Sequence, residues 1–296
     1  MIERERLTPW QLLYRLRGSI VPYIWKQVVA VSLLAALVCL AEEKGWIHIK
    51  PIIALPFSLI GIALSIFAGF RNSASYDRWW EGRKLWGQLV VESRSLIRQV
   101  DAYLPDRERG RKIGLRTAAF AHALRYHLRG GDGAEVLSGL LGAEEARTLM
   151  AVRNPPGRLL ESISGEIADA MRAGEVSDRI VQILEERLAA MSGILAGCER
   201  IKLTPLPLAY TLLLHRTAYL FCGLLPFGLV DAVGFWAPLI AAILSYTFFG
   251  LDALGTELED PFAATENGLR LDAICETIEG DIREMIGADS EPIRRT

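Results

Sequence analysis

The sequence predicts an all-α integral membrane protein, with four apolar helices and a helical domain outside the bilayer. Three observations support this fold class. Of the 296 residues, 51% are hydrophobic although 23% are charged, so the apolar residues must be concentrated in parts of the chain. They are concentrated in four runs, two of which carry no charged residue over roughly 18 to 20 positions, the length that spans a bilayer. Strand-like alternation of polar and apolar residues is essentially absent.

The first two apolar runs form a predicted membrane hairpin. The first extends from about Ile20 to Ala41, with Lys26 near its start, and the second extends from Pro51 to Phe70 without a charged residue. A short polar link at residues 42–45 joins them. No small-x-small cleavage pattern follows the first run, so we expect it to remain in the mature protein.

The segment from residue 71 to residue 202 predicts a helical domain outside the membrane. Charged residues recur there at helical spacing, and no apolar run reaches spanning length. Two amphipathic helices are indicated around residues 85–100 and 118–125. A third extends from about Ile180 to Cys198, with Ser177 as its candidate N-cap.

The last two apolar runs form a second predicted hairpin, from Leu203 to Val230 and from Gly234 to Leu251. His215 and Arg216 interrupt the third run, and charge at membrane depth is costly unless it faces protein or water. These two residues either form an ion or proton site, or the run divides into a surface segment and a shorter span, which is the simpler interpretation. The predicted domains are therefore residues 1–70, 71–202, 203–252 and 253–296.

Basic residues predict the orientation of these four spans. They precede the first span and follow the second, whereas the link at residues 231–233 contains no Lys or Arg. By the positive-inside rule, both termini and the large insert are cytoplasmic. The basic residues concerned are Arg15, Arg17, Lys26, Arg71, Arg78, Arg83 and Lys84.

Several function classes are disfavoured by the composition. The net charge of -2 gives no basic surface for nucleic acid. The four cysteines show no CxxC spacing, which favours buried reduced thiols over a metal or redox site. The carboxylates at Glu257, Glu259 and Asp260 are accompanied by no nucleophile with a recognisable base. We therefore expect no enzymatic activity, no metal and no cofactor.

Ile62, Ile66 and Phe70 are the candidate functional residues of the second span. They are spaced by four, so they share one helical face, and small residues elsewhere on this helix allow close approach of neighbours. A ring of such helices would form a hydrophobic constriction that controls conduction by wetting. The spacing alone is equally typical of packing or lipid-facing residues. Four helices per chain are too few to enclose a wide pore, so a channel requires an oligomer.

Three strings of residues carry a family resemblance. They are Phe70 to Trp80 with the motif Arg78-Trp79-Trp80, Thr204 to Thr211, and the acidic turn Glu257 to Phe262, in which Asp260 stands where the family has Asn. With four spans and a helical insert in this order, the chain resembles the bestrophin family of ion channels. The resemblance implies a homopentamer with a central pore, a neck at Ile62, Ile66 and Phe70, and a cytoplasmic constriction at or near Ile180.

The resemblance also implies details of ion passage and location. Residues 263–267 contain one carboxylate where eukaryotic members have a calcium-binding acidic cluster, so no calcium gating is expected. The chain looks prokaryotic, which implies the bacterial inner membrane. Glu175 and Asp178 near Ile180 favour sodium or potassium electrostatically. A chloride channel of the same family, a secondary transporter and a membrane-anchored scaffold are the alternatives.

Overall fold

The computed structural model describes residues 8–16, 18–48 and 54–287, and within these ranges every regular element is helical. The chain divides into two compact units. Unit 1 comprises the chain up to Trp79 together with Pro205–Pro261 and Thr265–Gly268. Unit 2 comprises Trp80–Thr204, Phe262–Ala264 and the chain from Leu269 onward. The all-α prediction is confirmed by the helices and by the solved structures described below.

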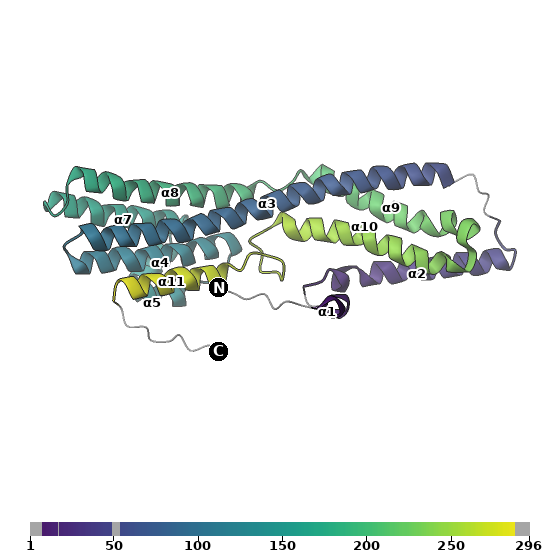
Figure 1. Ribbon diagram of the computed structural model, residues 1–296, viewed down its shortest axis with the longest axis horizontal. Coiled ribbons are helices and arrows are strands. Elements are labelled where there is room, and N and C mark those ends of the chain that lie inside the picture. The colour runs from purple at the N-terminus through teal and green to yellow at the C-terminus, as the bar shows by residue number, and fades with distance from the viewer. Residues whose placement is uncertain (1–7, 17, 49–53, 288–296) are drawn as a thin grey trace. The chain divides into compact units, whose positions relative to one another are not determined.

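Unit 1 is built from long apolar helices. It contains α1 (Pro9–Tyr14), α2 (Val21–Glu43), the first part of α3 (Ala54–Tyr103), α9 (Leu208–Val233), the short 3-10 turn η2 (Gly234–Trp236) and α10 (Ala237–Glu259). Helices α2, α9 and α10 lie side by side (Figure 1). Within the described ranges, three helical stretches are long and apolar enough to cross a membrane, namely Val21–Glu43, Phe57–Tyr103 and Leu208–Glu259. The third of these contains α9 and α10, which η2 connects.

Phe221 on α9 belongs to the apolar core of unit 1 and contacts rings on two neighbouring helices. Its ring centroid is 5.0 Å from that of Phe57 on α3 and 5.0 Å from that of Phe248 on α10. A Cβ atom at Gly61 would lie 3.0 Å from the Phe221 ring, so glycine permits α3 to approach α9 closely at this level. Helix α9 continues without a break through His215, so any division of this run into a surface segment and a span lies within one helix.

Helix α3 joins the predicted second span and the first predicted amphipathic helix into one helix of 50 residues (Figure 1). The predicted domain boundary at residue 71 lies inside this helix, whereas the two units divide between Trp79 and Trp80. Buried residues recur along α3 three, four or seven positions apart, as the spacing of a helical face requires. They include Leu64, Arg71, Ser75, Gly82, Trp86, Leu89, Ser93, Leu96 and Val100.

Unit 2 is a bundle of shorter helices. Besides the second part of α3 it contains α4 (Arg107–Arg129), α5 (Ala134–Leu141), α6 (Ala143–Met150), α7 (Pro155–Arg172), α8 (Asp178–Leu203) and α11 (Leu271–Met285). Helix α4 packs against α5, α7, α8 and α11. The predicted amphipathic helices at 118–125 and 180–198 lie within α4 and α8. Ser177 is the N-cap of α8 by backbone conformation, although its side chain makes no capping hydrogen bond.

The cysteines of unit 2 are buried, as the sequence predicted for these thiols. Burial raises the pKa of Cys198 to about 12, and burial likewise raises the pKa of Cys275 to about 12. A thiol with so high a pKa is protonated at neutral pH and is a poor nucleophile or metal ligand. All four cysteines are free in the structure.

Glu279 is a buried carboxylate that fastens α11 to α4. Its Oε2 lies 2.9 Å from His122 Nε2, and its Oε1 accepts a hydrogen bond from Arg283 Nε at 2.8 Å. The hydrogen bond with His122 lowers the pKa of Glu279 below its ordinary value of 4.5, and Arg283 adds to this effect against the opposing influence of burial. Because the pKa of Glu279 is lower in the folded protein than in the unfolded chain, its ionised carboxylate stabilises the fold at pH values above the unfolded-state pKa. This stabilisation is lost as the pH falls through the folded-state pKa.

Replacing Glu279 with glutamine should therefore destabilise unit 2 at neutral pH. We expect a loss of about 1–2 kcal/mol in the free energy of unfolding, because a charged hydrogen-bond acceptor becomes neutral. The variant should also lose less stability than the parent protein when the pH is lowered below 4.5. Thermal unfolding of the purified protein at several pH values measures both effects. The exposed Glu276 on the same helix is the control, because Glu276→Gln should change neither quantity.

Candidate functional site: the exposed face of α3 and its anchor

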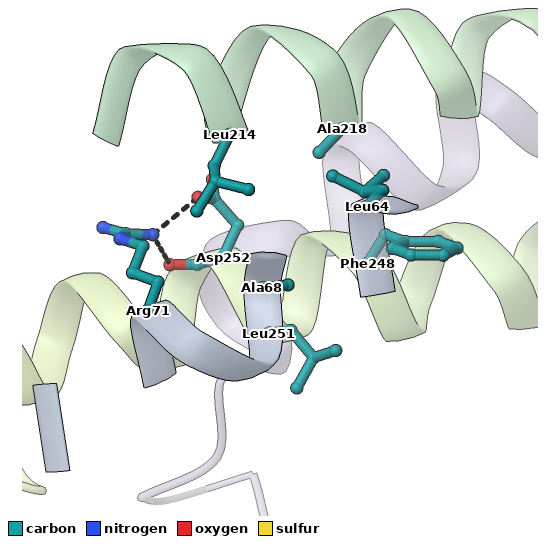
Figure 2. Close-up of a pocket in the computed structure, with 8 residues that line it drawn as sticks. All are labelled: Leu64, Ala68, Arg71, Leu214, Ala218, Phe248, Leu251 and Asp252. Carbon is teal, nitrogen blue, oxygen red and sulfur yellow. Dashed lines mark hydrogen bonds and ion pairs between the residues drawn. The ribbon is translucent and has the colours of Figure 1, made fainter. Parts of the chain in front are cut away.

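One face of α3 packs against its own chain in unit 1. Leu64 is 3% exposed and Arg71 is 2% exposed, and Gly61 and Ala68 lie on the same side of the helix. These positions are separated by three or four residues, which places them on one helical face. Leu64, Ala68 and Arg71 line a small cavity with residues of α9 and α10 (Figure 2). The inward face of this part of α3 is therefore occupied.

Ile62, Ile66 and Phe70 lie on the other side of the helix. At about 100° per residue, Ile62 and Ile66 each lie nearly opposite Leu64, and Phe70 lies beside them. Their side chains are 57%, 52% and 64% exposed in the single chain. The structure thus places the three predicted neck residues on one apolar surface that the other described residues of unit 1 leave largely exposed. In a single chain this surface is open to lipid or to another protein.

The exposed face changes from apolar to polar after Phe70. Ser73 and Asp77 continue the same face, three and seven residues further along α3, and both are exposed. Within the described residues, no hydrogen bond or ion pair engages the Asp77 carboxylate. A helix face that is apolar and then polar is suited to border a dry constriction that opens into water.

Arg71 forms the anchor on the packed face. Its Nη1 lies 2.8 Å from Asp252 Oδ1 and donates to the Asp252 backbone oxygen at 3.1 Å. Its Nη2 donates to Thr256 Oγ1 at 2.9 Å and lies 3.6 Å from Glu259 Oε2. Figure 2 shows the Arg71 side chain reaching from α3 to Asp252 on α10. A buried guanidinium is stable only when it is paired in this way, so this cluster joins α3 firmly to α10.

Asp252 also binds a residue of α9. Its second oxygen, Oδ2, lies 2.7 Å from His215 Nδ1. The His215 ring in turn lies 4.4 Å from the ring of Tyr219, between centroids. The carboxylate of Asp252 therefore connects α3, α9 and α10. The sequence drew attention to His215 because it interrupts the third apolar run, but it gave no sign that His215 contacts Asp252 or that Asp252 contacts Arg71.

Residues from the three strings that carry the family resemblance contact one another in unit 1. Arg78 Nε donates to the Glu259 backbone oxygen at 3.1 Å, and Trp79 Nε1 donates to the Asn267 backbone oxygen at 3.0 Å. The backbone N–H of Leu206 donates to Glu259 Oε1 at 3.1 Å. Residues far apart in the sequence thus hold the turn after α10 in place. Within the described ranges, no group of three or more His, Cys, Asp or Glu side chains is placed to hold a metal ion.

Ile180, the predicted cytoplasmic constriction, lies in the first turn of α8 and is half-buried within its own chain. Glu175, just before this helix, is not a free charge, because Arg109 Nε lies 3.4 Å from its Oε2. Arg109 also lies 3.5 Å from Glu166 Oε2. The prediction of cation selectivity near Ile180 depended on the negative charge of Glu175. Arg109 partly neutralises this charge, and the sequence did not connect the two residues.

Comparison with known proteins identifies the relatives of this chain. A family described as bacterial/fungal bestrophin protein matches residues 1–284. A voltage-dependent anion channel-forming protein of Mesorhizobium japonicum is 42% identical over 97% of this chain and 93% of its own length. A protein of the same description from Escherichia coli (strain K12) is 49% identical over 78% of this chain and 76% of its own length.

The solved structures agree with these sequence relatives. The crystal structure of a bacterial bestrophin homologue from Klebsiella pneumoniae is 39% identical to this chain. It superimposes with a TM-score of 0.85 over 90% of this chain and 100% of that one. The family match at residues 1–284 includes both predicted hairpins and the helical insert, so the similarity is not confined to one motif. The chain therefore belongs to the bacterial and fungal bestrophin family of ion-channel membrane proteins.

Proposed function

We propose that five copies of this chain assemble around an axis into a channel that passes monovalent ions passively, with anions favoured over cations. The observation that carries the proposal is the exposed face of α3, on which Ile62, Ile66 and Phe70 lie opposite the face that packs against α9 and α10. In the assembly these side chains form the neck of the pore, and Ile180 forms a second constriction. Five copies are proposed from the family resemblance.

The membrane arrangement belongs to the same proposal. In this proposal, helices α2, α9 and α10 and the apolar part of α3 are the four spans, and the distribution of Lys and Arg supports a cytoplasmic location of both termini and unit 2. The bacterial inner membrane is the proposed location. Four apolar helices in one chain enclose no wide pore, which supports a symmetric oligomer in which each copy contributes one α3 helix.

The preference for anions replaces the cation preference predicted from Glu175 and Asp178. Two observations support the change. The relatives from Mesorhizobium japonicum and Escherichia coli are named as anion channel-forming proteins. Within this chain, Glu175 is not a free charge, because it pairs with Arg109, an arginine that it shares with Asp106 and Glu166.

The proposal is tested by recording from the purified protein in planar bilayers under asymmetric sodium chloride. An ohmic current that reverses near the chloride equilibrium potential supports an anion channel. Reversal near the sodium equilibrium potential contradicts the proposed selectivity but keeps the channel. A saturable flux coupled to a substrate indicates a secondary transporter, and no flux in liposomes that contain folded protein indicates a scaffold.

Calcium should have little effect on this current. Of the acidic side chains that precede residue 263, Glu257 is engaged by the Asn267 amide at 2.9 Å, and only one carboxylate follows in residues 263–267. Calcium prefers six to eight oxygen ligands, several of them charged. Recordings with micromolar calcium and with a chelator should give the same current, and a sharp rise with calcium would refute this expectation.

A further inference from the structure

Arg71 stands next to the predicted neck in the sequence but differs from it completely in environment. Its side chain is 2% exposed, whereas that of Phe70 is 64% exposed. Successive residues of an α-helix point about 100° apart around its axis. Contacts that hold the Arg71 side chain in one direction therefore also set the direction in which Phe70 points.

Three side chains of α10 are placed to accept hydrogen bonds or ion pairs from the Arg71 guanidinium. Asp252, Thr256 and Glu259 are spaced by four and three residues, so they share one face of α10. The two terminal nitrogens of Arg71 contact all three side chains. A planar guanidinium with several donors resists rotation when it is held from two nitrogens, and a lysine ammonium at the same place lacks this geometry.

Gly255 allows α10 to approach the guanidinium. A Cβ atom there would lie 3.3 Å from Arg71 Nη1 and 2.6 Å from Asn72 Oδ1, so a larger residue would displace the side chains of Asn72 and Arg71 from these positions. Asp252 is held as well, because His215 contacts its other oxygen at 2.7 Å. Contacts from α3 and from α9 therefore hold the Asp252 carboxylate.

We infer that Arg71 is a positioning residue of the neck: its contacts with α10 set the rotation of α3 at Phe70 and thereby the width of the ring of Phe70 side chains. The inference rests on the proposed function, because it presupposes that Phe70 lines the pore. In this inference Arg71, which is buried and does not line the pore, controls the width of a constriction that its exposed neighbour Phe70 forms.

The test is a double-mutant cycle on single-channel conductance with the full chain in bilayers. Arg71→Lys keeps the charge but removes the planar fork, and Thr256→Val removes one uncharged acceptor. Each should change the conductance by about twofold or more in the parent protein, because residues in one hydrogen-bond network are energetically coupled. In a Phe70→Ala background the same substitutions should have almost no further effect, because the ring that they displace is gone.

The control is Arg116→Lys in unit 2, where the arginine also pairs with two carboxylates, those of Glu145 and Glu166. It should leave the conductance unchanged in both backgrounds. If Arg71→Lys does not assemble, Thr256→Val carries the same test. Equal fold-changes with and without Phe70, or no change in the parent protein, would overturn the positioning role while the neck stands. No effect of Phe70→Ala itself would overturn both the neck and the positioning role.

Discussion

Replacing Ile66 with alanine should raise the single-channel conductance several-fold. Apolar side chains stabilise an ion poorly, so the dehydration of ions at the neck is expected to limit the flux. Because each reduction of about 1.4 kcal/mol in a barrier raises a rate tenfold, even a small gain in hydration at this ring has a large effect. Ile66 is 52% exposed in the single chain, so its truncation leaves no cavity in the core of unit 1.

Ile60→Ala is the matched control for this experiment. Ile60 is 44% exposed on the same helix, but it lies about 120° around the axis from Ile66. The same substitution there should leave the conductance unchanged. An increase for both variants would point to a general loosening of α3, and an unchanged conductance for Ile66→Ala would remove Ile66 from the neck.

Replacing Asp77 with asparagine should raise the permeability of chloride relative to sodium. Asp77 continues the neck face into its polar part and is exposed, so five copies would form a ring of carboxylates below the neck. A single charge at 4 Å contributes about 1 kcal/mol even in bulk water, and a ring of charges adds up, although salt screens it. We therefore expect the permeability ratio to change several-fold, measured as a shift of the reversal potential toward the chloride equilibrium potential.

The control for Asp77 is Asp169 on α7, an exposed carboxylate that pairs with Arg172. Asp169→Asn removes the same charge from each copy. Asp169, however, is distant from Asp77 in the sequence and belongs to unit 2, whereas Asp77 belongs to unit 1. This substitution should leave the reversal potential unchanged. A shift for Asp169→Asn of the same size as for Asp77→Asn would show that net charge, and not a ring beside the neck, controls selectivity.

The elements of unit 1 were predictable because long apolar runs have few alternative structures. Helices α2 and α10 begin within a few residues of the predicted runs. The continuity of α3 was harder to predict, because composition changes at Arg71 from apolar to charged. The helical spacing of buried residues does not change there, and this periodicity is the signal that could have predicted one helix of 50 residues.

The contacts of the site were not predictable from one sequence. The Arg71 cluster joins residues about 180 positions apart, and periodicity contains no information on which faces of two helices meet. The ion pair between Arg109 and Glu175 was not predictable for the same reason, so Glu175 looks like a free negative charge in the sequence. Spacing placed Ile62, Ile66 and Phe70 on one face, but only the packed face of α3 shows which side of the helix is left open.

An image of the assembled protein in a lipid nanodisc, at a resolution that shows side chains, tests the central proposal most directly. We predict a symmetric ring of five copies in which Ile62, Ile66 and Phe70 of each α3 helix point toward a common axis. A monomer, or an oligomer in which these three side chains contact lipid, would contradict the proposed pore.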